Sequence, residues 1–186
     1  MPVFRKLLHD ELLRQRLSPE TALTVERHPF SILLDNTRSA YNVGSIFRSC
    51  DAALVQEIIL TGYTPPPTHK EVKKTALGAT ETVPWQHFPN SVEAADYLEN
   101  TGRRIIAVEL TDFARPYGSL TRADFPCCFI LGNELTGISP ELLHRAHDAI
   151  EIPMFGVKHS LNVAVAAGIV LFEAVRKWRA FSSDSI

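Results

Sequence analysis

The sequence predicts an α/β fold with a mostly parallel six-stranded sheet and flanking helices. Short apolar runs typical of strands alternate along the chain with longer amphipathic patterns typical of helices. The length of 186 residues suffices for one domain with a sizeable core, and hardly for two. Apolar residues make up 45% and charged residues 22% of the chain, as in ordinary soluble globular proteins.

In chain order, residues 2–28 come first and are predicted to be helical in two pieces. Ser18 as N-cap and Pro19 at the first helical position mark the start of the second piece. Strands are then expected at 30–34, 56–61, 82–88, 103–109, 127–131 and 149–152. Helices are expected at 42–54, 69–77, 91–101, 139–147 and 160–180. The segment GYTPPPTHK is interpreted as a rigid loop and not as a domain linker.

Charge and cysteine content restrict the class of protein. A net charge of −2 argues against tight, purely electrostatic binding of nucleic acid, although local basic patches remain compatible with it. Cys50, Cys127 and Cys128 show no metal-binding spacing, so they are expected to be buried free thiols in a reducing cytosol. The longest apolar run, LNVAVAAGIVLF, is too short to span a bilayer. We therefore expect a cytoplasmic protein with no metal and no membrane segment.

Polar loops that follow strands are the candidate sites, because ligands bind beyond the carboxyl ends of strands in an open parallel sheet. The first loop leads into NVGSIFRSCDAA, where Asn42 stands at the expected N-cap and Arg48 on the helix. The second is LGNELTGISP, in which flanking glycines let the backbone near Glu134 pass close to a ligand. In the third, Ser160 and Asn162 head a helix that is apolar nearly all round and is expected to be buried. The glycine-rich phosphate motifs G-x-G-x-x-G and G-x-x-x-x-G-K-[ST] are absent from the expected places.

Taken together, these loops resemble the SpoU-TrmH family of RNA ribose 2′-O-methyltransferases in the SPOUT class. NVGSIFRSCDA is similar to the first family motif, LGNELTG to the second and IPMFGVKHSLNVAVAAGI to the third, in the family's order and spacing. The resemblance implies a C-terminal segment threaded into a deep trefoil knot. It also implies a single methyltransferase domain over 1–186, with an N-terminal helical extension at 1–28 and the knot and cofactor site at 126–180.

The resemblance further implies the ligands and the site. The methyl donor would be S-adenosyl-L-methionine (SAM), the substrate an RNA (tRNA or rRNA), and the assembly a homodimer whose site uses both chains. A stripe of small residues, Ala164, Ala167 and Gly168, would let another backbone approach closely in such a dimer. The catalytic positions implied by the match are Arg48, Glu134, Ser160, Asn162 and Asn42. The cofactor-binding positions implied are Val108, Glu109, Gly132, Ile152 and Leu161.

Arg48 has two possible roles in ribose methylation. The family assigns an arginine at this position as the base, but a guanidinium is effectively always protonated. We therefore favour a charged Arg48 that grips the target phosphate and stabilises the developing alkoxide, with the proton passing to water or Glu134. A transiently neutral Arg48 stays open at this point.

Simpler roles and rival functions also stay open. Taken singly, Asn42, Ser160 and Asn162 fit helix caps, Glu134 fits a first-turn charge favoured by the helix dipole, and Gly132 fits a turn. The rival functions are an RNA-binding protein of the same fold without catalysis, and a SPOUT enzyme that methylates a base. Transfer RNA is the favoured substrate because no large accessory domain is evident, with ribosomal RNA as the alternative.

Overall fold

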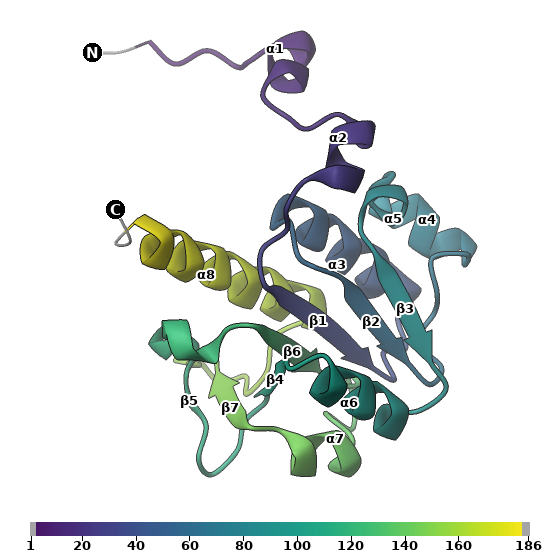
Figure 1. Cartoon of the computed structure of the whole chain (residues 1–186), viewed down its shortest axis with the longest axis vertical. Coiled ribbons are helices and arrows are strands. Elements are labelled where there is room, and N and C mark those ends of the chain that lie inside the picture. Colours follow the sequence, from purple (N-terminus) through teal and green to yellow (C-terminus); the bar gives the residue numbers. More distant parts are fainter. Residues whose placement is uncertain (1–2, 184–186) are drawn as a thin grey trace.

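The computed structural model describes residues 3–183, and within them seven strands form one sheet in which every pairing is parallel (Figure 1). The order across the sheet is β3-β2-β1-β6-β4-β7-β5. The strands are β1 (Phe30–Asp35), β2 (Ile58–Thr61), β3 (Trp85–Phe88), β4 (Arg104–Val108), β5 (Arg115–Pro116), β6 (Cys127–Leu131) and β7 (Asp148–Glu151). The helices are α1 (His9–Arg14), α2 (Pro19–Thr24), α3 (Ala40–Ala52), α4 (Lys70–Ala76), α5 (Ala79–Thr82), α6 (Ser91–Asn100), α7 (Pro140–Arg145) and α8 (Val163–Ser183).

The six predicted strands are all present, and the prediction of a six-stranded sheet is wrong by one. The added strand, β5, has two residues, too few to show any periodicity in the sequence. Side-chain contacts hold it at the edge of the sheet. Arg115 donates from Nε to Asp148 at 2.6 Å and from Nη2 to Asp124 at 2.8 Å.

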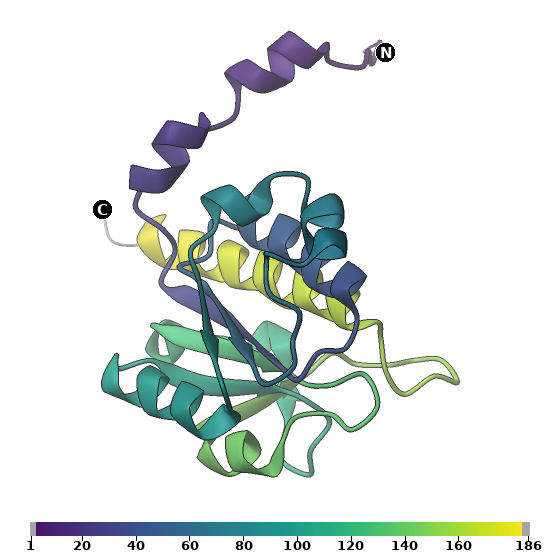
Figure 2. The ribbon, with the colours of Figure 1, turned by 90° about the vertical axis from the view of Figure 1, so that its right-hand side faces the viewer.

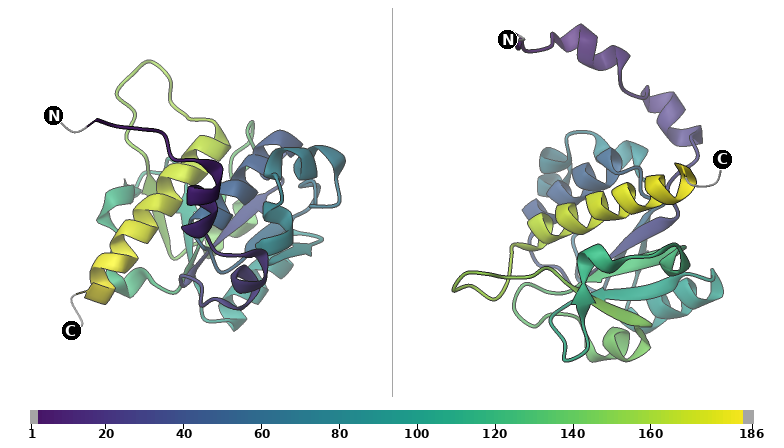
Figure 3. Two further views of the ribbon diagram at one scale, coloured as in Figure 1. Left: turned by 90° about the horizontal axis from the view of Figure 1, so that it is seen from above. Right: turned by 90° about the vertical axis from the view of Figure 1, so that its left-hand side faces the viewer.

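Helices cover both faces of the sheet (Figures 2 and 3). Alternation along β1 sends Ile32 and Leu34 into a core beneath α3, α4, α5 and α8, and sends Leu33 into a second core beneath α6 and α7. Since both faces are covered, every residue of β1 and β6 is buried, which explains their continuous apolar runs.

The start of α3 differs from the prediction. The helix begins at Ala40, and Ser39 is its N-cap, with Oγ accepting a 3.3 Å hydrogen bond from the Asn42 amide. The expectation that Asn42 is the N-cap is therefore wrong, and its side chain is free for contacts outside the helix. In α2, by contrast, the predicted N-cap is confirmed, since Ser18 Oγ accepts from the Thr21 amide at 3.2 Å.

The last helix is only partly buried, whereas burial nearly all round was expected. Its first residue is Val163, and Val165 and Phe172 are each 51% exposed. Of the small residues expected to serve a dimer, Ala167 packs inside the chain, and Ala164 and Gly168 are partly buried. Ala167 is fully buried in the core shared with α3, and a Cβ added at Gly168 would lie 3.9 Å from Ser49 Oγ on α3. The exposed Phe172 lies one helical turn after Gly168, so the stripe borders the outward face of α8.

The N-terminal segment consists of the two short helices α1 and α2, and it extends away from the sheet (Figures 1 and 2). The helix α1 has no buried residue, and α2 buries Ala22. The two predicted helical pieces are thereby confirmed in shorter form. Residues 1–2 of the predicted extension, and 184–186 of the predicted domain, lie outside the described residues.

Cys50, Cys127 and Cys128 are free and buried as predicted, and burial raises the pKa of the Cys50 thiol well above its usual value. Within residues 3–183, no group of three or more His, Cys, Asp or Glu side chains is placed to hold a metal ion. No helix in the same range is long and apolar enough to cross a membrane.

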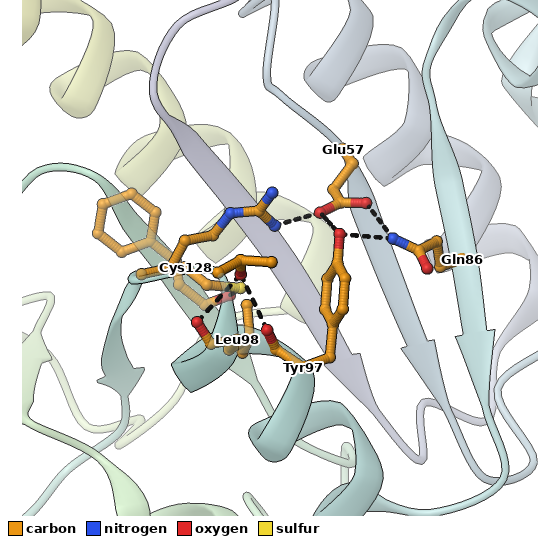
Figure 4. Close-up of polar contacts among 8 residues, drawn as sticks. Glu57, Gln86, Tyr97, Leu98 and Cys128 are labelled. Atoms are coloured by element: carbon orange, nitrogen blue, oxygen red, sulfur yellow. Dashed lines mark hydrogen bonds and ion pairs between the residues drawn. The ribbon is translucent and has the colours of Figure 1, made fainter.

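A buried ion pair lies under α6, near the amino ends of β2 and β4 (Figure 4). Arg103 donates to Glu57, and the two residues are 8% and 6% exposed. Both oxygens of Glu57 have further donors, Tyr97 Oη at 2.8 Å and Gln86 Nε2 at 2.7 Å. Because its polar atoms are paired in this way, the network can remain in the core, whereas a single unpaired charge there would be costly.

The substitution Arg103→Met is expected to lower the free energy of unfolding by about 3–5 kcal/mol, because it leaves the Glu57 carboxylate buried without its cation. Urea unfolding measures this loss. Replacing both partners, with Glu57→Leu and Arg103→Met, should restore a substantial part of it. Arg176→Met, which removes an exposed pair with Glu173, is the control and should cost less than about 1 kcal/mol. A loss below 1 kcal/mol in Arg103→Met would show that the buried pair is not coupled to stability.

Candidate active site

A cavity of about 490 Å³ opens at the carboxyl ends of β4, β6 and β7, the edge where parallel sheets bind ligands. Its walls come from these strand ends, the loop after β6 and the segment that leads into α8. That last segment, residues 152–162, projects from the body of the protein (Figure 2). The residues predicted to bind cofactor all line the cavity: Val108, Glu109, Gly132, Ile152 and Leu161. Three of the predicted catalytic residues line it as well: Glu134, Ser160 and Asn162.

The cavity combines apolar walls with negative charge. Leu131, Ile150 and Ala166 contribute apolar surface, and Glu109, Glu134 and Glu151 contribute carboxylates. Among the described residues that line it, there is no lysine or arginine. The electrostatic preference of the cavity is therefore for a ligand that carries positive charge.

The Glu134 carboxylate binds the amino end of α3. It accepts hydrogen bonds from the backbone amides of Arg38 at 3.0 Å and Ser39 at 3.2 Å, next to the helix start. Burial raises the pKa of Glu134, but these bonds, together with one from the Asn42 side chain, outweigh that effect and hold the pKa below its usual value. Glu134 is therefore a weak base. Its hydrogen bonds connect the loop of the second motif to the start of the first.

Asn42 joins all three motifs. Its Nδ2 donates to Glu134 Oε1 at 3.0 Å, and its Oδ1 accepts from Nδ2 of Asn162 at 3.1 Å. The Oδ1 atom of Asn162 accepts a 2.9 Å hydrogen bond from the amide of Ala164, in the first turn of α8. We call the hydrogen-bonded residues Asn162, Asn42 and Glu134 the amide chain. It connects segments that lie 92 and 120 residues apart in the sequence.

The loop after β6 is shaped by a residue that was not predicted, Asn133. Its backbone pairs with Gly137 through two hydrogen bonds of 2.9 Å, and its Oδ1 accepts from the amides of Leu135 and Thr136. The only sequence signal was an amide side chain between Gly132 and Glu134, the two residues that the family motif singles out.

Gly132 lies against this same loop. A Cβ at position 132 would lie 2.1 Å from the Gly137 carbonyl carbon and 2.2 Å from the Ile138 amide nitrogen. Gly137 itself has a φ of +71°, a conformation that favours glycine. The glycines were predicted to let the backbone approach a ligand closely. In the structure, Gly132 lets the backbone approach another backbone segment, at 137–138.

Asp35 is a second residue that sequence reasoning missed. It is 1% exposed at the end of β1, and its carboxylate accepts from Thr61 Oγ1 at 2.8 Å and Ser91 Oγ at 2.8 Å. It also accepts from the Ser139 amide at 2.7 Å, where α7 begins. The end of β2 and the starts of α6 and α7 are therefore fastened to the same buried group.

Arg48 does not line the cavity. It is exposed on α3 in a separate shallow hollow that Ser45, Ser49, Ala52 and Phe172 also line. Within residues 3–183 its side chain forms no hydrogen bond or ion pair. The structure thus brings together four of the five predicted catalytic residues, three at the cavity and Asn42 through the amide chain, and leaves Arg48 apart within a single chain.

The fold and the cavity define an α/β protein with a ligand site at the carboxyl edge of a parallel sheet. The sequence model of the SpoU rRNA Methylase family matches residues 29–172, most of the chain. The chain therefore belongs to this family, and the resemblance inferred from the three motifs is confirmed.

Individual relatives agree with this assignment. Over 168 residues the chain is 34% identical to the tRNA (guanosine(18)-2′-O)-methyltransferase of Thermus thermophilus, covering 90% of this chain and 84% of the relative. The structure of an A. aeolicus TrmH/SpoU tRNA modifying enzyme is similar with a TM-score of 0.78 and 28% identity, over 93% of this chain and 85% of that one. An AdoMet-bound rRNA methyltransferase from Sinorhizobium meliloti gives a TM-score of 0.76 and 31% identity, over 87% and 61% of the two chains. These structures confirm the α/β fold with a parallel sheet.

The substitution Gly132→Ala is expected to displace the backbone at 137–138, because its Cβ has no space. We expect a lower thermal unfolding temperature and at least about tenfold weaker binding of SAM in calorimetry, since the displaced loop forms a wall of the cavity. Gly118→Ala is the matched control, because the nearest atom to its Cβ is Glu173 Oε1 at 3.8 Å. Wild-type SAM affinity in Gly132→Ala would show that this wall does not contact the ligand.

The substitution Glu134→Gln is expected to lower stability in a pH-dependent way. The folded-state pKa of Glu134 lies below its usual value of 4.5, so the ionised carboxylate stabilises the fold above that value, and this contribution is lost as the pH falls through the folded-state pKa. The difference in unfolding temperature between wild type and variant should be constant from pH 7 to about pH 5 and shrink below it. Thermal scans at several pH values measure this, with Glu141→Gln on the exposed surface of α7 as control. A difference that persists unchanged to pH 3 would contradict the assignment.

Proposed function

We propose that this protein is a SAM-dependent RNA methyltransferase that methylates a ribose 2′-hydroxyl. The observation that carries the proposal is the convergence of three family motifs, distant in sequence, on one cavity through the amide chain. Family membership supports the same conclusion. The Thermus relative is named for a tRNA and the Sinorhizobium neighbour for an rRNA, so the proposed substrate class is tRNA or rRNA.

The cavity fits SAM. Its volume of about 490 Å³ is within the range of small-molecule sites, its apolar walls suit an adenine ring, and its carboxylates suit a sulfonium cation. The residues that would hold the cofactor are Val108, Glu109, Gly132, Ile152 and Leu161. When bound there, SAM supplies the methyl group for transfer to the ribose oxygen.

The residues of the amide chain are proposed to orient the site rather than to move protons. Glu134 already accepts three hydrogen bonds, and its lowered pKa makes it a poor acceptor for a ribose proton. Of the two acceptors considered from the sequence, water is therefore favoured. Ser160 is exposed at the cavity wall, where its hydroxyl is available to hydrogen-bond the ribose.

We propose that Arg48 acts in the cavity of a partner subunit within a homodimer. Three observations support this: Arg48 is exposed, it lies outside the cavity of its own chain, and it shares its hollow with the half-exposed apolar residue Phe172. Val165, one of the other apolar residues on α8, is equally exposed. A guanidinium from the partner would grip the RNA phosphate and stabilise charge on the ribose oxygen without losing its proton.

The C-terminal knot and the domain arrangement are also part of the proposal. The knot over 126–180 is supported by the position of β7 between β4 and β5, two strands that follow each other in the sequence. It is further supported by contacts of α8 with the turns at 117–119 and 122–124. We propose one methyltransferase domain over 1–186 with the helical extension at 1–28, working in the cytosol, where its three free thiols would stay reduced.

Mass spectrometry of nucleosides tests the reaction. Unmodified tRNA and rRNA are incubated with the protein and SAM, then digested. We expect a 2′-O-methylated nucleoside. Methylation on a base would support the rival enzyme class, and binding of SAM and RNA without any methylation would support the non-catalytic rival.

The substitution Arg48→Ala is expected to lower single-turnover methyl transfer by roughly 10²–10³-fold, the usual effect of removing one electrostatic stabiliser. Arg48→Lys keeps the charge but loses the planar fork, so it should retain a measurable fraction of the rate with an unchanged pH profile. SAM affinity should be nearly unaffected in both. A near-normal rate in Arg48→Ala would leave Arg48 as a surface charge, and a shifted pH profile in Arg48→Lys would favour proton transfer by this residue.

Mixed dimers test whether Arg48 acts across subunits. Arg48→Ala and Gly132→Ala chains are combined at a SAM concentration below the dissociation constant of the Gly132→Ala variant, where each chain alone is strongly impaired. If Arg48 serves the partner's cavity, each mixed dimer has one intact site, and a statistical mixture should recover about a quarter of wild-type activity. If it serves its own chain, no intact site forms and the activity of the mixture stays at the level of the impaired single variants.

A further inference from the structure

Tyr63 combines an exposed ring with a fixed hydroxyl. The residue is 62% exposed in the loop after β2, yet its Oη accepts a 2.8 Å hydrogen bond from Asn133 Nδ2. Asn133 lines the cavity proposed for SAM. Tyr63 itself does not line it, so the ring lies beside the cavity and not inside it.

The backbone on both sides of Tyr63 is also held in place. Before it, Gly62 has a φ of +58°, and a Cβ there would lie 2.1 Å from Oδ1 of Asn36. After it, Thr64 Oγ1 accepts from the Thr37 amide at 2.9 Å and donates to the Leu34 carbonyl at 3.1 Å. An exposed side chain on a rigid frame loses little conformational entropy when a ligand covers it.

Exposed positively charged residues follow in the two segments that meet at Thr64. Thr37, which bonds Thr64, is followed by Arg38. The loop that carries Tyr63 ends at Lys70, the first residue of α4. Both side chains are exposed. Cations contact phosphates and fix the register of a nucleic acid, while exposed aromatic rings stack on unpaired bases.

We infer that the ring of Tyr63 is a stacking platform for a base of the RNA substrate, next to the nucleotide that is methylated. The inference rests on the proposed function and adds an RNA contact that the three family motifs do not contain. The hydroxyl–Asn133 bond positions the ring relative to the cavity, and the ring face binds the base.

The test compares Tyr63→Ala, Tyr63→Leu and Tyr63→Phe. RNA affinity is measured by fluorescence anisotropy with an unmodified tRNA transcript and an rRNA fragment, and SAM affinity by calorimetry. Removing the ring, in the Ala and Leu variants, should weaken RNA binding by about 10- to 100-fold, the usual effect of losing one stacked base. The Phe variant keeps the ring and should stay within about threefold of wild type. SAM affinity and unfolding temperature should not change in any of them.

Tyr41→Ala is the matched control. Tyr41 is a similarly exposed tyrosine, 56%, whose hydroxyl interacts with Glu71 instead of the cavity loop. Its replacement should weaken RNA binding much less than Tyr63→Ala does. An equal loss in the two variants would show a general surface effect and would overturn the inference.

Two further outcomes would overturn it. Wild-type RNA affinity in Tyr63→Ala would show that the ring contacts no base. A Phe variant as weak as the Ala variant, or a loss of SAM affinity in either, would show that the hydroxyl only supports the loop. Failure of the proposed function gives a different result, because wild type would then bind RNA without methylating it. The RNA affinities of the Tyr63 variants would still test the stacking platform in that case.

Discussion

The constraint on which the site depends is the unfilled hydrogen-bonding capacity at the amino end of α3. The first amides of a helix have no carbonyl partner within the helix, so they must be satisfied from elsewhere. Here the Glu134 carboxylate accepts from the amide of the N-cap residue Ser39 and from that of Arg38 just before it, and the Asn42 side chain bonds both Glu134 and Asn162, which precedes α8. One helix start therefore fixes the second and third motifs relative to each other, and with them two walls of the cavity.

The residues that hold the cavity in shape are different from those available to contact the reacting groups. Glu134 and Asn162 line the cavity, yet their polar atoms already bind other protein groups. The groups left available differ in kind. Ser160 has an exposed hydroxyl at the cavity wall. Arg48 has an exposed charge outside the cavity of its own chain. Transfer of a methyl group from a sulfonium cation, which leaves as a neutral thioether, needs mostly alignment, and the amide chain is suited to provide it.

Much of the fold follows from the sequence, because apolar runs and alternating patterns reflect burial directly. The six longer strands and the five main helices were predicted on this basis. The strand β5 was not, since its two residues show no periodicity and are held by pairing with β7 and by the contacts of Arg115 with Asp148 and Asp124. Asn42 was misread as a cap because Ser39, three residues earlier, competes for the same role. The placement of the three loops at one edge of the sheet followed from the predicted parallel strands. The roles of the individual residues came from the resemblance, since contacts across 92 and 120 residues leave no local pattern.

The coupling between Asn42 and Glu134 tests the amide chain most directly. SAM affinity is measured by calorimetry for Asn42→Ala, Glu134→Ala and the double variant. If the two residues act as one connection, the double variant should bind no more weakly than the weaker single variant, which corresponds to a coupling of at least about 1 kcal/mol. Additive losses in the double variant would contradict the account, because they would mean that each residue supports the cavity independently.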